Sequence, residues 1–188
     1  MRQLRLPALI VVVGLAATPV LAHPGHDGVS LAAGIGHPLT GIDHLLAMLA
    51  VGVLAAMRGG PARWAWPAGF LSAMLAGFGL GQLAPGAGVE PAILASVIVL
   101  GGLMATSARM PGAVGLLLII AFGLAHGYAH GMEAPGGGYG FPVGFLLSTA
   151  ALHAVGLLAG GALKTRPRIA QMLGVATAAG GLVLAVAG

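Results

Sequence analysis

Long apolar runs, separated by short breaks rich in glycine and proline, dominate the amino-acid sequence. Six of these runs are each close to the roughly 20 residues that a helix needs to cross a bilayer. The breaks contain half of the twelve charged residues as well, which is typical of helix ends and loops. The pattern predicts six transmembrane helices, at about residues 38–57, 64–84, 90–108, 112–131, 140–163 and 168–187.

The composition agrees with this prediction, because 58% of the 188 residues are hydrophobic and 6% are charged. Ordinary soluble domains carry roughly a quarter charged residues. We therefore expect an all-α integral membrane protein, a bundle of six transmembrane helices. The pI is about 10.8, but the basic residues are too few and too dispersed for a nucleic-acid-binding patch. The chain has no cysteine, which excludes disulfides, thiolate ligands and cysteine nucleophiles.

The first 22 residues have the pattern of a cleavable signal peptide. Arg2 and Arg5 precede an apolar stretch, and residues 19–22 (Pro-Val-Leu-Ala) suit a cleavage point after Ala22. The mature chain would then be a six-helix transmembrane domain at residues 23–188. The alternative is an uncleaved first helix, which leaves the topology of the later helices unchanged.

The basic residues predict the orientation of the helices. Lys and Arg occur only in alternate loops of the predicted bundle, at Arg58, Arg63, Arg109, Lys164, Arg166 and Arg168. The intervening loops carry Glu90 and Glu133 instead. Because basic loops stay in the cytoplasm, we expect the mature N-terminus and the C-terminus to be periplasmic.

The seven histidines gather in a few motifs, together with three of the four acidic residues. Imidazole and carboxylate groups are costly in hydrocarbon, so in membrane segments they usually mark an ion path or a catalytic centre. Without thiols, this donor set suits nickel, cobalt, zinc or copper. The candidate metal ligands, all on the outer side or within the membrane, are His23, His26, His37, Asp43, His44, His126, His130, Glu133 and His153.

In the fourth predicted helix, His126, His130 and Glu133 follow one another at spacings of four and three residues. They therefore share one helical face. Two imidazoles one turn apart can bind one ion, and the partial negative charge at a helix C-terminus favours a cation there. The alternative is a pair of packing histidines with an interfacial glutamate.

The first predicted helix begins with a second motif, His37-Pro-Leu-Thr-Gly-Ile-Asp43-His44. Pro38 suits the first turn of a helix and favours an extended His37 before it. Asp43 is expected either to ligate the metal or to hold a ligating imidazole by its second nitrogen. An Asp–His pair that only ties two helices together is the alternative.

The remaining candidates are weaker. His153, inside the fifth predicted helix, is either a ligand or relay, or a core residue hydrogen-bonded to Thr149. His23 and His26, with Asp27, form either an outer capture site or part of a solvated tail. Gln82 is a further candidate donor.

The order of these motifs resembles the HupE/UreJ family, which are bacterial hydrogenase- and urease-accessory membrane proteins regarded as nickel or cobalt permeases. The resemblance covers the mature chain and rests on two long motifs, residues 37–44 and 125–133. Leu124 departs from it, since many members have an aromatic residue there. The resemblance implies that six residues handle the metal: His37, Asp43, His44, His126, His130 and Glu133.

We therefore expect secondary uptake of Ni²⁺ or Co²⁺ across the bacterial inner membrane, from periplasm to cytoplasm, supplying hydrogenase, urease or cobalamin maturation. The sequence has no Gly-x4-Gly-Lys-[Ser/Thr] loop for ATP, and we expect neither enzymatic activity nor a prosthetic group. The expected partners are the metal ion, the lipid bilayer and further copies of the chain. The alternatives are a membrane metal sensor and an intramembrane zinc hydrolase with Glu133 or Asp43 as general base.

Overall fold

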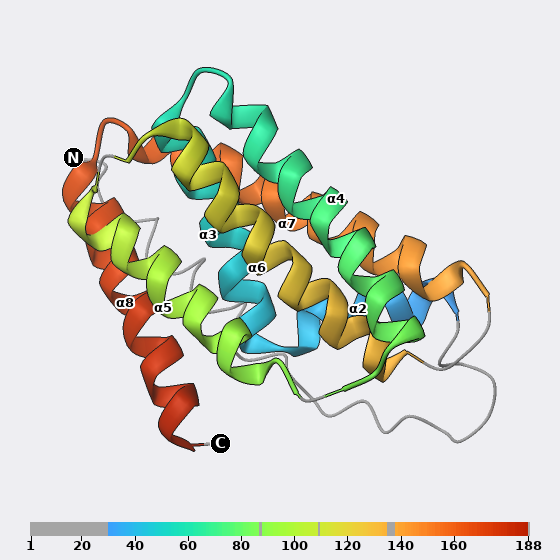
Figure 1. The fold of residues 1–188 in the computed structure, drawn as a ribbon. Helices are drawn as coiled ribbons and strands as arrows, with labels where there is room; N and C mark the ends of the chain where they lie inside the picture. The colour runs from blue at the N-terminus through green and yellow to red at the C-terminus, as the bar shows by residue number, and fades with distance from the viewer. Residues whose placement is uncertain (1–29, 87, 109, 135–137, 188) are drawn as a thin grey trace.

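The computed structural model describes residues 30–86, 88–108, 110–134 and 138–187. The predicted signal peptide, together with His23 and His26, lies outside these residues. The described part is all-α, as predicted, and contains seven helices (Figure 1). They are α2 (Leu31–Thr40), α3 (Ile42–Arg58), α4 (Ala62–Leu83), α5 (Glu90–Thr106), α6 (Gly112–Glu133), α7 (Gly140–Leu163) and α8 (Pro167–Ala187).

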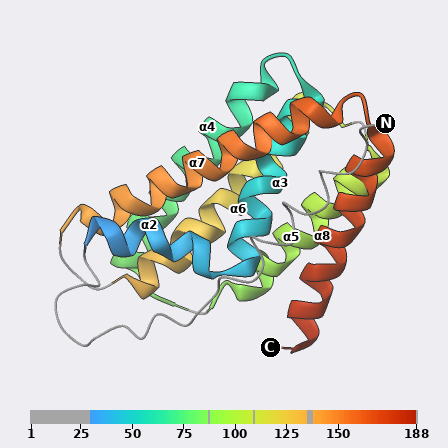
Figure 2. The same ribbon diagram turned by 180° about the vertical axis from the view of Figure 1, so that it is seen from behind.

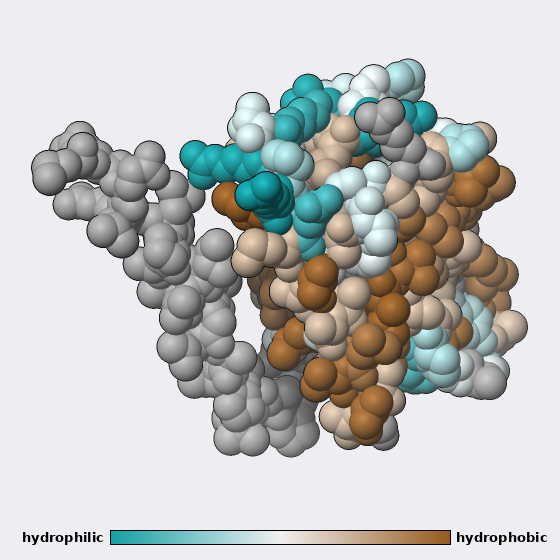
Figure 3. Space-filling view, turned by 90° about the vertical axis from the view of Figure 1, so that its left-hand side faces the viewer, coloured by the Kyte–Doolittle hydropathy of each residue, from teal (hydrophilic) through white to brown (hydrophobic). Residues whose placement is uncertain are grey.

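Three of these helices, α6, α7 and α8, are long and apolar enough to cross a membrane. The bent pair α2 and α3 adds a fourth candidate span if both helices are counted together. Hydrophobic residues cover most of the face shown in Figure 3, and hydrophilic residues gather toward its upper end. The described chain therefore has the surface of a membrane protein.

The first predicted helix is the one that the structure corrects. A helix already begins at Leu31, where the Ser30 hydroxyl accepts a hydrogen bond from the Ala33 N–H at 3.0 Å. The chain then bends by 86° between α2 and α3, at Gly41, whose backbone is extended. The predicted unbroken start near residue 38 is therefore wrong.

His37 and Pro38 consequently lie inside α2, rather than His37 being extended before a first turn at Pro38. The physical reason is tertiary. At Gly34 a Cβ atom would collide with the Phe141 carbonyl of α7, so the missing side chain lets α2 pack directly on α7. This contact outweighs the local preference of a residue before proline for extended backbone.

Glycines set how closely the longer helices approach. Added Cβ atoms at Gly127 of α6 and Gly52 of α3 would overlap the backbones of α4 and α7, respectively. Small residues allow such close backbone contact between membrane helices, where packing rather than water exclusion drives association. The helices therefore pair as α4 with α6, α3 with α7 and α5 with α8.

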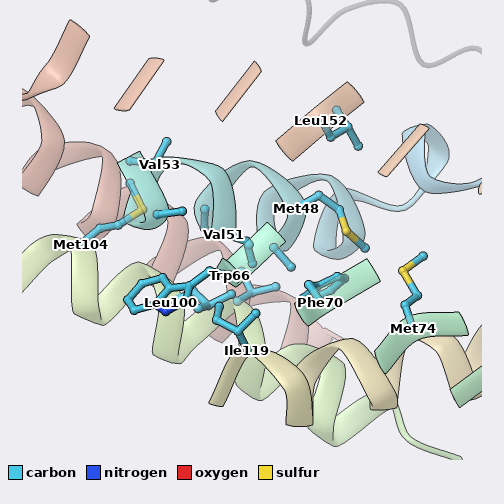
Figure 4. Packing of buried hydrophobic residues seen from close by; sticks show 14 of the residues in the cluster. Met48, Val51, Val53, Trp66, Phe70, Met74, Leu100, Met104, Ile119 and Leu152 are labelled. Carbon is cyan, nitrogen blue, oxygen red and sulfur yellow. The ribbon is translucent and has the colours of Figure 1, made fainter. Parts of the chain in front are cut away.

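The apolar core lies between these pairs. It includes Trp66 and Phe70 of α4, Met48 and Val51 of α3, and Ile119 of α6, all at most 5% exposed. Figure 4 shows these side chains gathered at the centre of the bundle. The core separates the two ends of the molecule.

The basic residues and the histidines lie at opposite ends of the bundle. The turns between α3 and α4 and between α7 and α8 lie at the same end (Figures 1 and 2). A Cβ atom added at Gly59 would lie 3.7 Å from Lys164 Nζ, which places these two turns in contact. We call this the basic end. The helix ends near His37 and Glu133 form the other end.

Candidate metal site

Residues from α2, α3 and α6 meet at the end of the bundle opposite the basic end. The outermost group consists of His37, His130 and Glu133, each with one ligand atom within 4.8 Å of the others. His37 Nε2 lies 3.2 Å from Glu133 Oε2, and the His37 and His130 ring centroids lie 4.8 Å apart. This group offers two imidazoles and a carboxylate to a single ion.

A second group continues inward from His130. The ring centroid of His44 lies 4.8 Å from that of His130 and 4.9 Å from that of His126. Together with Glu133 and His37, these side chains form a continuous series, which we call the histidine cluster. It runs from the 54% exposed Glu133 side chain to the fully buried His126.

Asp43 holds the His44 ring in place. Its Oδ1 accepts hydrogen bonds from the His44 Nδ1–H at 2.8 Å and from the His44 backbone N–H at 2.7 Å. Gly41 leaves room for this pair, because a Cβ atom there would lie 2.9 Å from Asp43 Oδ1. Of the two predicted roles of Asp43, these hydrogen bonds fit the one in which the carboxylate orients an imidazole.

The hydrogen bonds of His44 and His126 define which nitrogen is free. The Phe122 carbonyl and the Asp43 carboxylate can only accept, so Nδ1 carries the proton in both rings. Nε2 then presents a lone pair, which is the form of imidazole that binds metals. Both Nε2 atoms are buried without a hydrogen-bond partner among the described residues.

Unpartnered imidazole nitrogens distinguish this region from the rest of the described chain. Of its seven buried side-chain N and O atoms without a partner, six belong to His44, His126, His130 and His153. Folded proteins satisfy most buried polar groups, and an unsatisfied one costs about 1–3 kcal/mol. Nitrogens grouped in this way leave several lone pairs available to one ligand.

His153 lies deeper, on α7, and is 1% exposed. Neither its ring nitrogens nor Thr149 Oγ1 have a partner among the described residues, so the bond that one of the two alternatives for His153 requires is not present. The Phe70 ring contacts both His153 and the cluster, since its centroid lies 5.1 Å from that of His153 and 5.5 Å from that of His126. His153 is therefore the next donor inward, beyond one aromatic side chain.

Aromatic side chains around the cluster were missed by the sequence analysis. The Phe145 ring stacks on His130 with centroids 5.0 Å apart, and Phe141 packs edge-on against His37 at 5.3 Å. Both rings come from α7 at a spacing of four residues, which places them on one face. Gln82, a candidate donor, instead ties α4 to α6, because its Nε2 donates to the Gly131 carbonyl at 2.6 Å.

Comparison with known proteins identifies the family of the chain. A family model described as HupE / UreJ protein matches residues 10–184. The chain belongs to the HupE/UreJ family. It is 38% identical over 140 residues to Protein HupE of Rhizobium leguminosarum bv. viciae, covering 72% of this chain and 73% of that protein. No solved structure matches the chain. The resemblance that the motifs predicted is thus confirmed.

Proposed function

We propose that this HupE/UreJ protein transports Ni²⁺ or Co²⁺ through the bacterial inner membrane into the cytoplasm. The observation that carries the proposal is the series of imidazoles from the half-buried His37, beside the exposed Glu133, to the buried His126. The Nε2 atoms of His44, His130 and His126 along this series have no hydrogen-bond partner among the described residues. Donors that follow one another at about 5 Å can pass an ion between overlapping sites. A closed structural site would instead surround one position.

The charges of the cluster suit a divalent cation. With neutral imidazoles, Asp43 and Glu133 supply two negative charges, which equal the charge of one Ni²⁺ or Co²⁺ ion. Transport requires binding that is strong enough for capture and weak enough for release. Imidazole and carboxylate ligands without thiolate meet this requirement. The membrane potential can drive inward movement, at about 2.3 kcal/mol per charge per 100 mV.

The proposal includes six membrane spans, counting α2 and α3 as one broken span and adding α4 and α5. At about 1.5 Å per residue, the 22 residues of α4 reach across the roughly 30 Å of a hydrocarbon core. Placing the basic end in the cytoplasm follows the positive-inside rule. The histidine cluster then faces the periplasm, where the metal enters.

The test is uptake of radioactive Ni²⁺ and Co²⁺ by cells that lack their own importers for these metals. Cells expressing the chain should accumulate metal, and His130→Ala should abolish accumulation. Tyr128→Phe is the matched control, because Tyr128 lies on the same helix but its hydroxyl donates to the Ala84 carbonyl at 2.8 Å, outside the cluster. Equal amounts in the membrane are required for all variants.

Two results would contradict the proposal: no accumulation by a well-inserted wild type, or equal accumulation by His130→Ala. The first would favour a metal sensor or a zinc hydrolase, and the purified protein would then be analysed for bound zinc. The ratio of Ni²⁺ to Co²⁺ uptake identifies the preferred substrate.

A further inference from the structure

A cavity of about 440 Å³ lies at the basic end, on the other side of the core from the histidine cluster. Its walls come mainly from α3, α5 and α6, with apolar side chains such as Leu103 and Leu118. Two polar side chains also line it, Arg58 at the end of α3 and Ser107 at the end of α5. Both lie next to the loops of the basic end. None of the metal ligands considered above lines it.

One turn of α4 connects this cavity to the histidine cluster. Trp66 lines the cavity, and Phe70, whose ring contacts His126 and His153, lies four residues further along the same helix. Residues at this spacing share a helical face and are about 6 Å apart along the axis. Figure 4 shows Trp66, Phe70 and Ile119 together in the core. The barrier between cavity and cluster is therefore only a pair of aromatic side chains thick.

The aromatic barrier is tightly packed, but the helix that carries it lacks one backbone hydrogen bond. The Trp66 ring fits so tightly against α6 that a Cβ atom added at Gly115 would overlap it. Pro67 lies between Trp66 and Phe70, inside α4, and has no N–H to donate to the preceding turn. The start of α4, next to Trp66, therefore lacks one hydrogen bond of the helix, the one that residue 67 would donate to the Arg63 carbonyl.

The cavity is large enough for a hydrated cation, and its charged side chain would not bind one. Six waters at about 30 Å³ each fill roughly 180 Å³, so the cavity has room for a hydrated cation. Arg58, the charged side chain at its mouth, disfavours retention of a cation in the cavity.

We propose that this cavity is the exit vestibule of the metal path, and that Trp66 is the barrier between the vestibule and His153. The proposal rests on the transport function proposed above. It predicts a water-filled space that opens to the cytoplasm and ends at Trp66.

The absence of cysteine from the sequence makes this prediction directly measurable, since each substituted cysteine is the sole thiol. Leu118→Cys places a thiol in the vestibule wall. Leu117→Cys is the matched control, one residue away on α6 and 67% exposed on the apolar outer surface. A membrane-impermeant maleimide is applied to inverted membrane vesicles, which expose the cytoplasmic face, and to spheroplasts, which expose the periplasmic face.

We expect Leu118→Cys to react at least tenfold faster than Leu117→Cys in inverted vesicles, to be protected in spheroplasts, and to lose metal uptake once labelled. An unreactive Leu118→Cys would overturn the vestibule and indicate a lipid-filled cleft. A labelled Leu118→Cys with full uptake would overturn its role in exit. If neither the wild type nor unlabelled Leu118→Cys takes up metal, the transport function itself fails, while the labelling still reports on the cavity.

The barrier is tested with Thr149→Cys, on the His153 side of Trp66. This thiol should be protected from the cytoplasmic reagent and should become reactive when Trp66→Ala is added. Leu118→Cys with Trp66→Ala serves as the control for folding. If that control still reacts but the Thr149→Cys, Trp66→Ala double variant stays protected, Trp66 is not the barrier.

Discussion

Replacing Asp43 with asparagine should separate the orientation of His44 from the folding of α3. The Asp43 carboxylate accepts both the ring N–H and the backbone N–H of His44. An asparagine side chain has nearly the same shape, and its amide oxygen still accepts at the start of α3, where asparagine is well tolerated. What the substitution removes is the negative charge on the far side of the imidazole from the metal.

The size of the effect follows from the hydrogen bond between Asp43 Oδ1 and His44 Nδ1, which is 2.8 Å long. A bond to an ionised acceptor contributes about 1.5–3 kcal/mol, against about 0.5–1.5 kcal/mol for a neutral one. Losing about 1–1.5 kcal/mol weakens metal binding by roughly five- to tenfold. The upper end of that range reaches the smallest losses of metal affinity, roughly tenfold, that follow when the hydrogen-bond partner of a metal-bound histidine is removed. The charge lost at the N-terminus of α3 costs stability only about 0.3–1 kcal/mol.

The assay is the concentration dependence of Ni²⁺ uptake, measured beside the melting temperature of the purified protein. We expect the concentration at half-maximal uptake to rise roughly tenfold in Asp43→Asn, with a melting temperature lowered by only a few degrees. Asp43→Ala should lose more, because it removes the acceptor as well as the charge. An unchanged half-saturation concentration in Asp43→Asn at normal abundance would refute the orienting role.

Three further outcomes are expected. Uptake should fall several-fold as the external pH is lowered from about 7.5 to 6, because protons compete with the metal for imidazole lone pairs; steady or rising uptake would argue against histidine ligands. Gly127→Ala should destabilise the detergent-solubilised protein by about 1–3 kcal/mol, because its Cβ would overlap the Met74 backbone. Gly102→Ala, which has open space around it, should not change the stability. Equal melting temperatures of the two variants would contradict the packing account. His153→Ala should lower the maximal uptake rate, and Glu133→Gln should instead raise the half-saturation concentration; the reverse pattern would place capture at the inner end.

Most helices were predictable because apolar length is itself a strong constraint. The ends of α6 and α7 fall within two residues of the predicted 112–131 and 140–163. The start of α2 was not predictable in the same way. Four of residues 31–36 are alanine or glycine, so the segment has little hydrophobic periodicity. It becomes helical through the Ser30 cap and the packing of Gly34 on α7, which the local sequence pattern does not indicate.

The candidate site was predictable as a set of residues but not as a sequence of contacts. The spacing of His126, His130 and Glu133 requires a shared face on one helix, and the structure brings His37 and His44 to that face. Phe70 was out of reach, because a phenylalanine inside an apolar run has the same pattern whether it faces lipid or a histidine. The missing Thr149 bond of His153 could be found only from coordinates.

The break at Gly41 explains how two histidines from one segment serve one cluster. In an unbroken helix, residues seven apart are separated by about 10 Å along the axis. The 86° bend reduces the distance between the ring centroids of His37 and His44 to 6.4 Å. His130 then lies 4.8 Å from both rings. The extended residue between α2 and α3 is therefore what brings His37, which pairs with the exposed Glu133, next to the more deeply placed His44.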